Sequence, residues 1–577
     1  MPQDQGLFRP ADALEMSTKA IPDTESDAPQ DTQTLKNDPG TETKGLQTGL
    51  LMTALCLSVF LAALDITIVT TALPTISEHF HSTSGYVWVG SAFLLASAAS
   101  TPNWGKFSDI WGRKVVLQTA AAVFFLGSAL CGASVSLPML IAGRSVQGAG
   151  AGGLLSMVNI IIGDLFSQRD RGKYYGIIGM VWAIAAALGP VIGGALTNNV
   201  SWRWCFYINL PVTGVLFVII ALTLKIHTPK TPLIAGIKAV DWLGSLTIAG
   251  GTLMLLLGLQ LGGGFRPWGS ATVICLLVFA VVTLAIFAVV EWRVARYPVL
   301  PLHLFADRSN IATLLVNFFH GIVFTQASYF LPIYFQSVLG ASPLLSGVWI
   351  LPFAIAVSLT AVAAGGYIKA TGRYLDPIRL GLLLTVLGSG LFLYFPARSA
   401  SWARLATFQI IAGVGVGANF QPPLIALQSN VPAQDNAAAT ASFGLVRNVA
   451  SAVAVVAGSA AFAGEMAAQQ DVLRRALGDR VAALLSGANA QGNLFVVGTL
   501  DAAQREVVRR AFFNALRHVW IESVCFAAAG LVACLVIRNR KLDREHVEVK
   551  TGLEGEEARR KIVEERRMGE KKNGSSV

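Results

Sequence analysis

The chain has 577 residues, of which 53% are hydrophobic and 14% charged, with a formal net charge of +10 and a mean hydropathy of +0.57. A soluble protein carries about a quarter charged residues, so these values exclude an ordinary soluble domain and predict an all-α polytopic membrane protein. The basic residues are spread over short loops and the C-terminal tail. Nucleic-acid binding is therefore not expected, because it would gather them on one soluble domain.

A polar N-terminal tail comes first. Residues 1–48 are rich in Asp, Thr, Pro and Gln, which predicts a disordered cytoplasmic segment and no cleavable signal peptide. Fourteen apolar stretches follow, each near the length of about 20 residues that a spanning helix needs. They lie near 49–72, 86–104, 115–134, 139–162, 172–196, 205–225, 241–261, 270–291, 310–331, 344–368, 377–395, 403–425, 438–463 and 517–537.

The loop charges predict the orientation of these fourteen helices. With the N-terminus inside, the short cytoplasmic loops hold most of the loop lysines and arginines, such as Lys106, Arg169 and Lys369. The short outer loops then hold only Arg203, Arg266, Arg398 and Arg404. Because cytoplasmic loops carry the excess of basic residues, both ends are expected inside. The six cysteines form no C-x-x-C motif and no His/Cys cluster, so neither disulfides nor a metal site are expected.

An internal repeat divides the chain into two halves. GKFSDIWGRK (105–114) follows the second span as GGYIKATGRY (365–374) follows the tenth, which aligns Gly105 with Gly365, Gly112 with Gly372 and Arg113 with Arg373. Two six-helix bundles with two inserted helices account for fourteen spans, and transporters are commonly built from such repeats. The expected parts are a tail 1–48, a bundle 49–225, a linker with two inserted helices 226–309, a bundle 310–537 with a long outer loop 464–516, and a cytoplasmic tail 538–577.

The 105–114 loop places charges and glycines between two apolar helices. Gly105 and Gly112 permit close helix approach and a sharp turn, and Asp109 can bind the Arg113 side chain. With Lys114, and with Arg373 as the counterpart in the second half, this pattern predicts a latch that holds the two bundles in one conformation. The alternative is that the basic residues only set the topology.

Five segments resemble the major facilitator superfamily, and within it the fourteen-span drug:proton antiporter branch and its fungal toxin-efflux members. The latch loop resembles the superfamily signature, and LDITIVTTALP (64–74) and LIAGRSVQGAGAG (140–152) resemble the first- and fourth-helix motifs of the branch. GIIGMVWAIAAALGPVIGG (176–194) resembles the antiporter motif of the fifth helix, and ATASFGLVRNVASAVAV resembles a late segment of the toxin exporters. The matching residues of the fifth-helix motif are Gly176, Gly189, Pro190, Gly193 and Gly194. The resemblance implies export of small molecules against protons.

Two ionisable residues of these motifs are the candidates for proton coupling. An ionised group inside the hydrocarbon costs about 3 kcal/mol or more, so it is a functional candidate by default. Asp65 and Arg144 lie at similar depths in antiparallel spans, so they could pair. Burial raises the pKa of a carboxyl group in general and a neighbouring arginine lowers it, so a pair that separates could take up a proton. The alternative is a static pair that only joins two helices.

The substrate cavity is expected to be mostly apolar, with amides and few charges. The candidate cavity residues are Gln147, Asn317, His320, Gln326, Gln421 and Arg447. His320 could titrate near neutral pH, although a lone histidine of this kind is more often a packed polar group. Asn199 begins a glycosylation sequon in a short outer loop.

The expected function is a proton-coupled exporter of amphipathic organic compounds, such as toxins, secondary metabolites or drugs, with no cofactor beyond the proton gradient. Its partners would be the lipid bilayer, the substrate and protons, and the chain is expected to be a monomer in the plasma membrane. A vacuolar transporter of basic amino acids or small cations is the alternative. A nucleotide-driven pump is excluded because no G-x4-G-K-[ST] motif exists, and an enzyme is not expected.

Overall fold

The computed structural model describes residues 39–81, 83–224, 229, 231–264, 266–396, 401–487, 489–494, 496–544, 551–557 and 560. The chain forms two compact units, Met1–Gln47 and Thr48–Val577. The first 38 residues of the expected N-terminal tail lie outside the described residues, and so does most of the C-terminal tail beyond residue 544. The second unit contains the spanning helices and all the sites discussed below.

The described residues form helices and no strand. The first half contains α1 (Pro39–His79), α2 (Thr83–Trp111), α3 (Arg113–Gly132), α4 (Leu137–Leu165), α5 (Arg171–Asn199), α6 (Trp204–Tyr207) and α7 (Asn209–Thr223). Next come α8 (Leu233–Ala239), α9 (Trp242–Gly264), α10 (Ala271–Arg293) and the short 3₁₀ helix η1 (Leu302–Phe305).

The second half repeats the pattern with several breaks. It contains α11 (Arg308–Ser337), α12 (Pro343–Trp349), α13 (Leu351–Thr371), α14 (Leu375–Phe392), α15 (Trp402–Ala418), α16 (Pro422–Asn430), η2 (Ala433–Asp435) and α17 (Asn436–Ala468). Four short helices and the last long one follow: α18 (Gln470–Leu477), α19 (Asp479–Leu484), α20 (Asn489–Gly492), α21 (Val496–Thr499) and α22 (Ala502–Cys534).

The expected all-α membrane fold is confirmed. Thirteen helical segments of the described chain are long and apolar enough to cross a membrane. The remaining expected span, 86–104, is α2, which is 29 residues long but contains serines, threonines and an asparagine that lower its hydropathy. Outward-facing positions also stay apolar: α10 exposes Val278, Phe279 and Val281. Such a surface is stable in hydrocarbon rather than in water.

Prolines break two of the expected spans. The 344–368 stretch divides at Ile350 into α12 and α13, and the 403–425 stretch divides at residues 419–421 into α15 and α16. Each second piece has a proline in its first turn, where the missing N–H costs no helical hydrogen bond. The last helix starts at Ala502 rather than at 517, so part of the expected outer loop belongs to α22.

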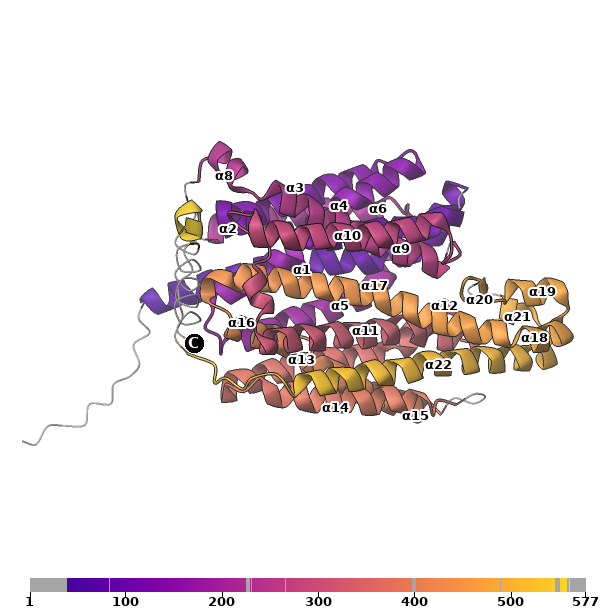
Figure 1. Ribbon diagram of the computed structural model, residues 1–577. Helices are drawn as coiled ribbons and strands as arrows, with labels where there is room; N and C mark the ends of the chain where they lie inside the picture. The colour runs from indigo at the N-terminus through magenta and orange to yellow at the C-terminus, as the bar shows by residue number, and fades with distance from the viewer. Residues whose placement is uncertain are drawn as a thin grey trace, which may run out of the picture. The chain divides into compact units, whose positions relative to one another are not determined.

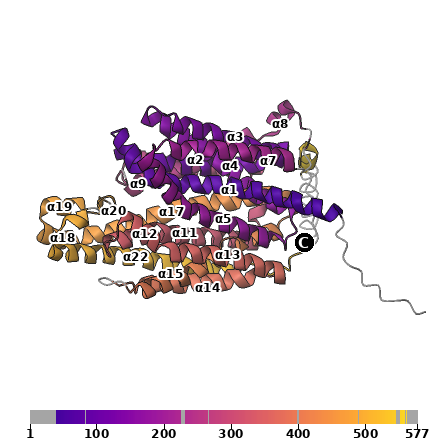
Figure 2. The ribbon, with the colours of Figure 1, turned by 180° about the vertical axis from the view of Figure 1, so that it is seen from behind.

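The two halves meet along two pairs of long helices. Helix α5 packs against α13 and α2 packs against α17, while the inserted helix α9 packs on α10, α2 and α17. In Figures 1 and 2 these helices run side by side, with α8 and α16 toward one end and α18 and α19 at the other. The end with α8 carries the basic loops, so we call it cytoplasmic.

The outer end of the second half has a small helical cap. Residues of α18 to α21 and the start of α22 pack into the same apolar cluster as α11. Leu473, Ala482, Leu485 and Ala490 are fully buried there. The expected helical outer segment is therefore present, and it rests on the second bundle.

Candidate functional site

Asp65 lies in a buried polar network between α1, α4 and α7. Its Oδ2 accepts a hydrogen bond from Arg144 Nη1, and its Oδ1 accepts from Gln147 Nε2 at 2.7 Å and from Asn209 Nδ2 at 2.9 Å. The side chains of Asp65 and Arg144 are 0% and 2% exposed. An opposite charge and three donors therefore compensate this carboxylate in apolar surroundings.

Arg144 has further partners besides Asp65. Its Nε donates to Val89 O at 3.0 Å, and its Nη1 also donates to Gln147 Oε1 at 2.7 Å. The guanidinium carbon lies 4.3 Å from the centroid of the Phe93 ring, which is within the range of a cation–π interaction. The arginine thus keeps several contacts even if the carboxylate becomes neutral.

Close helix packing builds this network. Arg144 and Gln147 are three residues apart, so both side chains leave the same face of α4. A Cβ on Gly148 would lie 2.7 Å from Phe93 Cα, and one on Gly127 would lie 2.6 Å from Gln147 Cβ. These glycines let α2 and α3 approach α4, and they bring Ser128 Oγ within 2.8 Å of Gln147 Nε2, which donates to it.

Asn209 and Ser128 were not predicted from the sequence. Asn209 is the first residue of α7 and is 1% exposed. Its position a few residues inside the outer end of the 205–225 stretch gave a usable signal, because a polar residue at that depth needs a buried partner. Ser128 gave no comparable signal, since a serine in a helix can bond its own backbone.

The predicted latch residues divide between a buried cluster and two separate contacts. Arg113 donates to Asp109 Oδ1 at 2.7 Å, to Asp164 Oδ2 at 2.6 Å and to Ser108 Oγ at 2.6 Å. Asp164 Oδ1 also accepts from Asn436 Nδ2 at 2.9 Å. Asp164 and Asn436 were not predicted, yet this hydrogen bond joins α4 of the first half to α17 of the second.

The two glycines of the loop have distinct tasks. Gly112 has φ +87° and its repeat counterpart Gly372 has φ +74°, a region that side chains disfavour. A Cβ on Gly105 would lie 3.2 Å from Ala441 Cβ, so this glycine lies where α2 meets α17. Both copies of the repeat therefore place a glycine with positive φ between their two helices, although ψ differs, at 159° for Gly112 and 13° for Gly372.

The structure does not place Lys114 or Arg373 in the latch. Lys114 Nζ donates to Ala221 O at 2.7 Å, within the first half. Arg373 is 69% exposed and lies 3.9 Å from Asp376. The prediction for Arg373 is wrong, because Lys369 stands where the first copy has Asp109 and offers no carboxylate.

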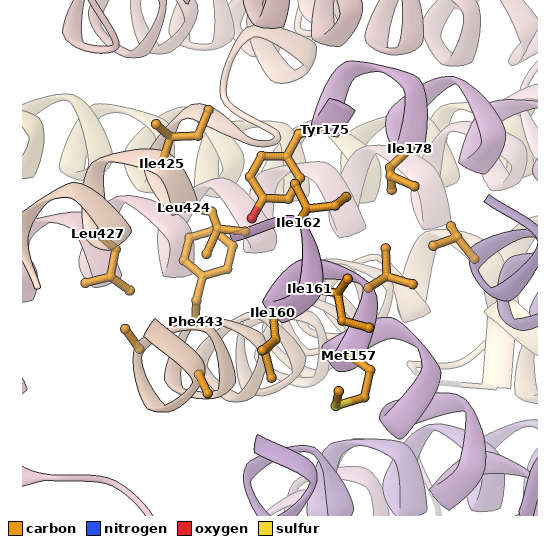
Figure 3. Close-up of a cluster of buried hydrophobic side chains, with 14 of the residues drawn as sticks. Met157, Ile160, Ile161, Ile162, Tyr175, Ile178, Leu424, Ile425, Leu427 and Phe443 are labelled. Carbon is orange, nitrogen blue, oxygen red and sulfur yellow. The ribbon is translucent and has the colours of Figure 1, made fainter. Parts of the chain in front are cut away.

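Apolar packing closes the cytoplasmic ends of the two halves. Figure 3 shows Met157, Ile160, Ile161 and Ile162 of α4, Tyr175 and Ile178 of α5, Leu424, Ile425 and Leu427 of α16, and Phe443 of α17 in one buried cluster. Around it, Arg169 Nε donates to Lys369 O at 2.6 Å and Tyr175 Oη donates to Gln428 Oε1 at 3.2 Å. We call this assembly, with the Asp164–Asn436 hydrogen bond, the cytoplasmic gate.

Three glycines of the fifth-helix motif, Gly176, Gly189 and Gly193, lie where α5 closely approaches other helices. A Cβ on Gly189 would overlap the Thr67 side chain of α1, and one on Gly193 would overlap Ile68 O. A Cβ on Gly176 would lie 3.0 Å from Val362 Cα of α13. Gly194 has open space around it, so the structure does not support its place on the packing face. Pro190 lies inside α5.

The candidate cavity residues fall into separate groups. Gln147 belongs to the Asp65 network, and Arg447 Nη1 donates to Asn317 Oδ1 at 3.4 Å and to Phe420 O at 3.4 Å. The Arg447 guanidinium also lies 4.2 Å from the centroid of the Phe420 ring. His320 is 1% exposed, with Nε2 2.8 Å from Val416 O, which fits the packed polar group.

Gln326 belongs to a third polar group, nearer the outer end. Its Nε2 donates to Glu522 Oε2 at 3.2 Å, and its Oε1 accepts from Ser523 Oγ at 2.7 Å. Glu522 is a carboxylate within the last span that sequence reasoning missed. Gln421 is buried at the turn between α15 and α16. Asn199 is exposed at the end of α5 and donates to Ala195 O at 3.0 Å.

Comparison with known sequences identifies the relatives of the chain. The sequence profile of the Major Facilitator Superfamily matches residues 55–455. A protein of Dothistroma septosporum named Efflux pump dotC is 51% identical over 507 residues, which cover 88% of this chain and 87% of the relative. The MFS-type transporter ppz2 of Metarhizium majus is 47% identical, with 92% of both chains covered.

Two solved structures share the fold. A human organic anion transporter, MFSD10, superposes with a TM-score of 0.52 at 15% identity, covering 85% of this chain and 99% of that one. The proton:xylose symporter XylE superposes with a TM-score of 0.55 at 14% identity, covering 86% and 97%. At these identities the similarity concerns the arrangement of helices alone.

Proposed function

Because the chain belongs to the Major Facilitator Superfamily, we propose that it is a proton-coupled secondary exporter of amphipathic organic compounds that works by alternating access. Membership in this superfamily makes it a multi-pass membrane transporter rather than an enzyme. The outward direction of transport is supported by relatives named efflux pumps, such as dotC and FUS6 of Gibberella fujikuroi, the latter 35% identical with 92% of this chain covered.

The buried Asp65–Arg144 contact is the observation that best supports the proposal of proton coupling. A carboxylate enclosed in hydrocarbon is stable when a cation and donors compensate it, and neutralising it by a proton releases the cation. Arg144 would then rely on Val89 O, Gln147 and Phe93, all of which already contact it. Protonation of Asp65 thus changes how strongly α1 is held to α4, which is the kind of change that can bias a conformational equilibrium.

The surroundings of Arg447 support an amphipathic substrate. Phe324 and Phe420 lie with ring centroids 5.7 Å apart, and both are half-buried, as Arg447 is. Aromatic rings with one guanidinium and one amide fit a mostly apolar compound that also carries a few hydrogen-bond acceptors. We propose that the substrate is a toxin or secondary metabolite and that the chain acts as a monomer in the plasma membrane. A vacuolar membrane is the alternative location.

The test is proton-driven uptake into inside-out vesicles that contain the full chain. The probes are a panel of fluorescent amphipathic compounds and candidate metabolites, and the wild type is compared with Asp65→Asn and with Glu78→Gln. Glu78 lies on the same helix, is exposed, and controls for the loss of an acid.

We expect an acid-inside gradient to drive accumulation in the wild type and in Glu78→Gln, and Asp65→Asn to abolish it without lowering the amount of inserted protein. Accumulation by Asp65→Asn at the wild-type rate would overturn the coupling role of this residue. Accumulation that is independent of the gradient in the wild type would overturn proton coupling altogether.

A further inference from the structure

Arg447 of α17 is a cation inside the second bundle whose hydrogen-bonding capacity is poorly used. Its Nη1 donates to Asn317 Oδ1 of α11 and to Phe420 O, both at 3.4 Å, whereas a usual N–H···O distance is about 2.9 Å. Its Nη2 is buried and has no hydrogen-bond partner in the part of the chain that the structure describes. A guanidinium carries five N–H donors, so this one retains donors for a further acceptor.

The charge of Arg447 also differs from that of the other buried arginines. Arg144 pairs with Asp65, and Arg113 pairs with two aspartates. Among the described residues, the hydrogen-bond partners of Arg447 are an amide and a backbone carbonyl, and it forms no ion pair. A cation enclosed in hydrocarbon is costly unless an anion compensates it. The uncompensated guanidinium therefore marks a position where an anion would be stabilised.

Arg447 lies on the outer side of the closed cytoplasmic gate. Phe443, which Figure 3 shows in the gate cluster, precedes it by four residues and so shares its face of α17. At about 1.5 Å per residue, Arg447 lies roughly 16 Å along α17 from its cytoplasmic start at Asn436. Because the hydrocarbon core is about 30 Å thick, this position is near the middle of the membrane.

The break between α15 and α16 lies beside Arg447. Phe420 belongs to this break, and its ring centroid lies 4.2 Å from the guanidinium carbon. The Phe324 ring of α11 meets the Phe420 ring edge-on, with the centroids 5.7 Å apart. All three side chains are half-buried, so they are not sealed by protein. Transporters commonly bind their substrates at interrupted helices near the midplane.

A purely structural role of Arg447 is the alternative. Helix ends leave carbonyl groups without helical partners, and Arg447 could serve only to satisfy Phe420 O at the break. The observed geometry does not favour this role, because the hydrogen bond is long and Nη2 makes none among the described residues. A neutral donor would satisfy the same carbonyl without placing an ionised group inside the membrane.

We propose that Arg447 binds the acidic group of the substrate, so that the exported compound is an amphipathic organic anion, such as a carboxylate or an ionised phenol. The apolar body of this compound packs on Phe324 and Phe420. A guanidinium suits such a group because its planar fork can donate to two oxygens of a carboxylate. A basic amino acid or another cation would instead meet a like charge. This proposal rests on the export function proposed above and adds the charge of the substrate to it.

The experiment compares the binding of acids with the binding of their neutral amides. The probes are anthracenecarboxylate and anthracenecarboxamide, together with the matching pyrene and naphthalene pairs. Binding to the purified full chain in detergent is followed by energy transfer from tryptophan to the probe, at neutral pH, where the acids are ionised. The wild type is compared with Arg447→Gln and Arg447→Lys.

The matched control is Arg404→Gln. Arg404 is exposed, and its guanidinium carbon lies 5.5 Å from the centroid of the Phe408 ring, so this variant also removes a positive charge beside an aromatic ring. We expect the wild type and Arg404→Gln to bind at least one acid roughly tenfold more tightly than its amide, because a charge-assisted hydrogen bond is much stronger than a neutral one. Arg447→Gln should bind both at the wild-type amide affinity, and Arg447→Lys should keep part of the preference for the acid.

Three results would overturn the proposal. The first is a wild type that binds no acid of the panel more tightly than its amide. The second is a preference for the acid that persists in Arg447→Gln. The third is a loss of both probes together with a lower unfolding temperature in both Arg447 variants, because Arg447 would then only stabilise the helix break. Since binding needs neither a gradient nor turnover, these results are separate from the outcome of the Asp65→Asn transport test.

Discussion

Arg113 and Arg373 occupy equivalent positions of the internal repeat but have opposite surroundings. The Arg113 side chain is 1% exposed and pairs with both Asp109 and Asp164, whereas Arg373 is 69% exposed. A buried charge network loses several kcal/mol when one member is removed, while an exposed pair contributes little. The same residue type therefore stabilises one half of the molecule and leaves the other nearly unaffected.

We expect Arg113→Gln to lower the free energy of unfolding by about 3–5 kcal/mol, because two carboxylates stay buried without their cation. Arg373→Gln is expected to change the thermal stability little. Thermal unfolding of the detergent-solubilised protein, followed by tryptophan fluorescence, measures both. Equal losses in the two variants would contradict the distinction between a buried latch in the first half and a solvated loop in the second.

At the residue scale, the sequence predicts a contact only where a motif gives the spacing of two residues or where two residues lie at the same depth in the membrane. Asp65 and Arg144 lie at similar depths in antiparallel spans, and the structure brings them into contact. The spacing also predicted that Asp109 and Arg113 could interact. Asp164 and Asn436 are separated by 272 positions, and no local pattern specifies a pairing over that distance.

At the scale of single helices, the glycines of one motif in α5 allow close packing against two different helices, α1 and α13. Its outer half packs on α1 through Gly189 and Gly193, and its cytoplasmic half approaches α13 through Gly176. Small residues allow this approach, and close packing is a main source of helix association in a bilayer. Gly194 belongs to the same motif but meets no neighbour, so the motif and the packing face differ at this position.

We expect Gly189→Ala to reduce transport strongly and Gly194→Ala to leave it near the wild-type rate. The added methyl group at 189 would lie 2.6 Å from Thr67 Cβ and overlap its hydroxyl, which forces α1 and α5 apart. Overpacking of this kind typically costs about 1–3 kcal/mol. Gradient-driven uptake, normalised to inserted protein, measures the effect. If Gly194→Ala fails as badly as Gly189→Ala, the motif acts through something other than this packing face.

The sequence predicts the number and order of the helices better than their breaks. Long apolar stretches predict spans because a bilayer requires them, and this predicted the all-α fold correctly. The breaks at Ile350 and at residues 419–421 coincide with prolines, but a proline can also lie inside a continuous helix, as Pro190 does in α5. Whether it breaks the helix depends on tertiary contacts that local sequence does not specify.

At the scale of the whole second unit, the contacts of the gate describe a conformation that is closed on the cytoplasmic side. Apolar residues of α4, α5, α16 and α17 pack together, and hydrogen bonds from Arg169, Tyr175 and Asn436 cross between the halves around them. In alternating access these contacts must break when the gate opens. Each of them therefore sets part of the free-energy difference between two conformations.

The Asn436–Asp164 hydrogen bond contributes directly to the free-energy difference between the closed and the open gate. Asn436→Asp would replace the donor by a second carboxylate at the 2.9 Å position beside Asp164, and like charges at that distance repel. We expect this variant to favour the open gate. In inside-out vesicles, a membrane-impermeant maleimide should then alkylate the cysteine of an Ala439→Cys variant severalfold faster, because Ala439 is 1% exposed within the gate cluster. Transport should fall, because a chain held in one conformation completes the cycle slowly.

The matched control is Asn430→Asp. Asn430 Nδ2 donates to Ser309 Oγ at 3.1 Å, within the second half and away from the gate contacts to the first. The same amide-to-acid change there meets a hydroxyl, which can donate to the new carboxylate, so alkylation at position 439 should stay slow. Rapid alkylation in Asn430→Asp, or none in Asn436→Asp, would show that charge at the α4–α17 contact does not govern gate opening.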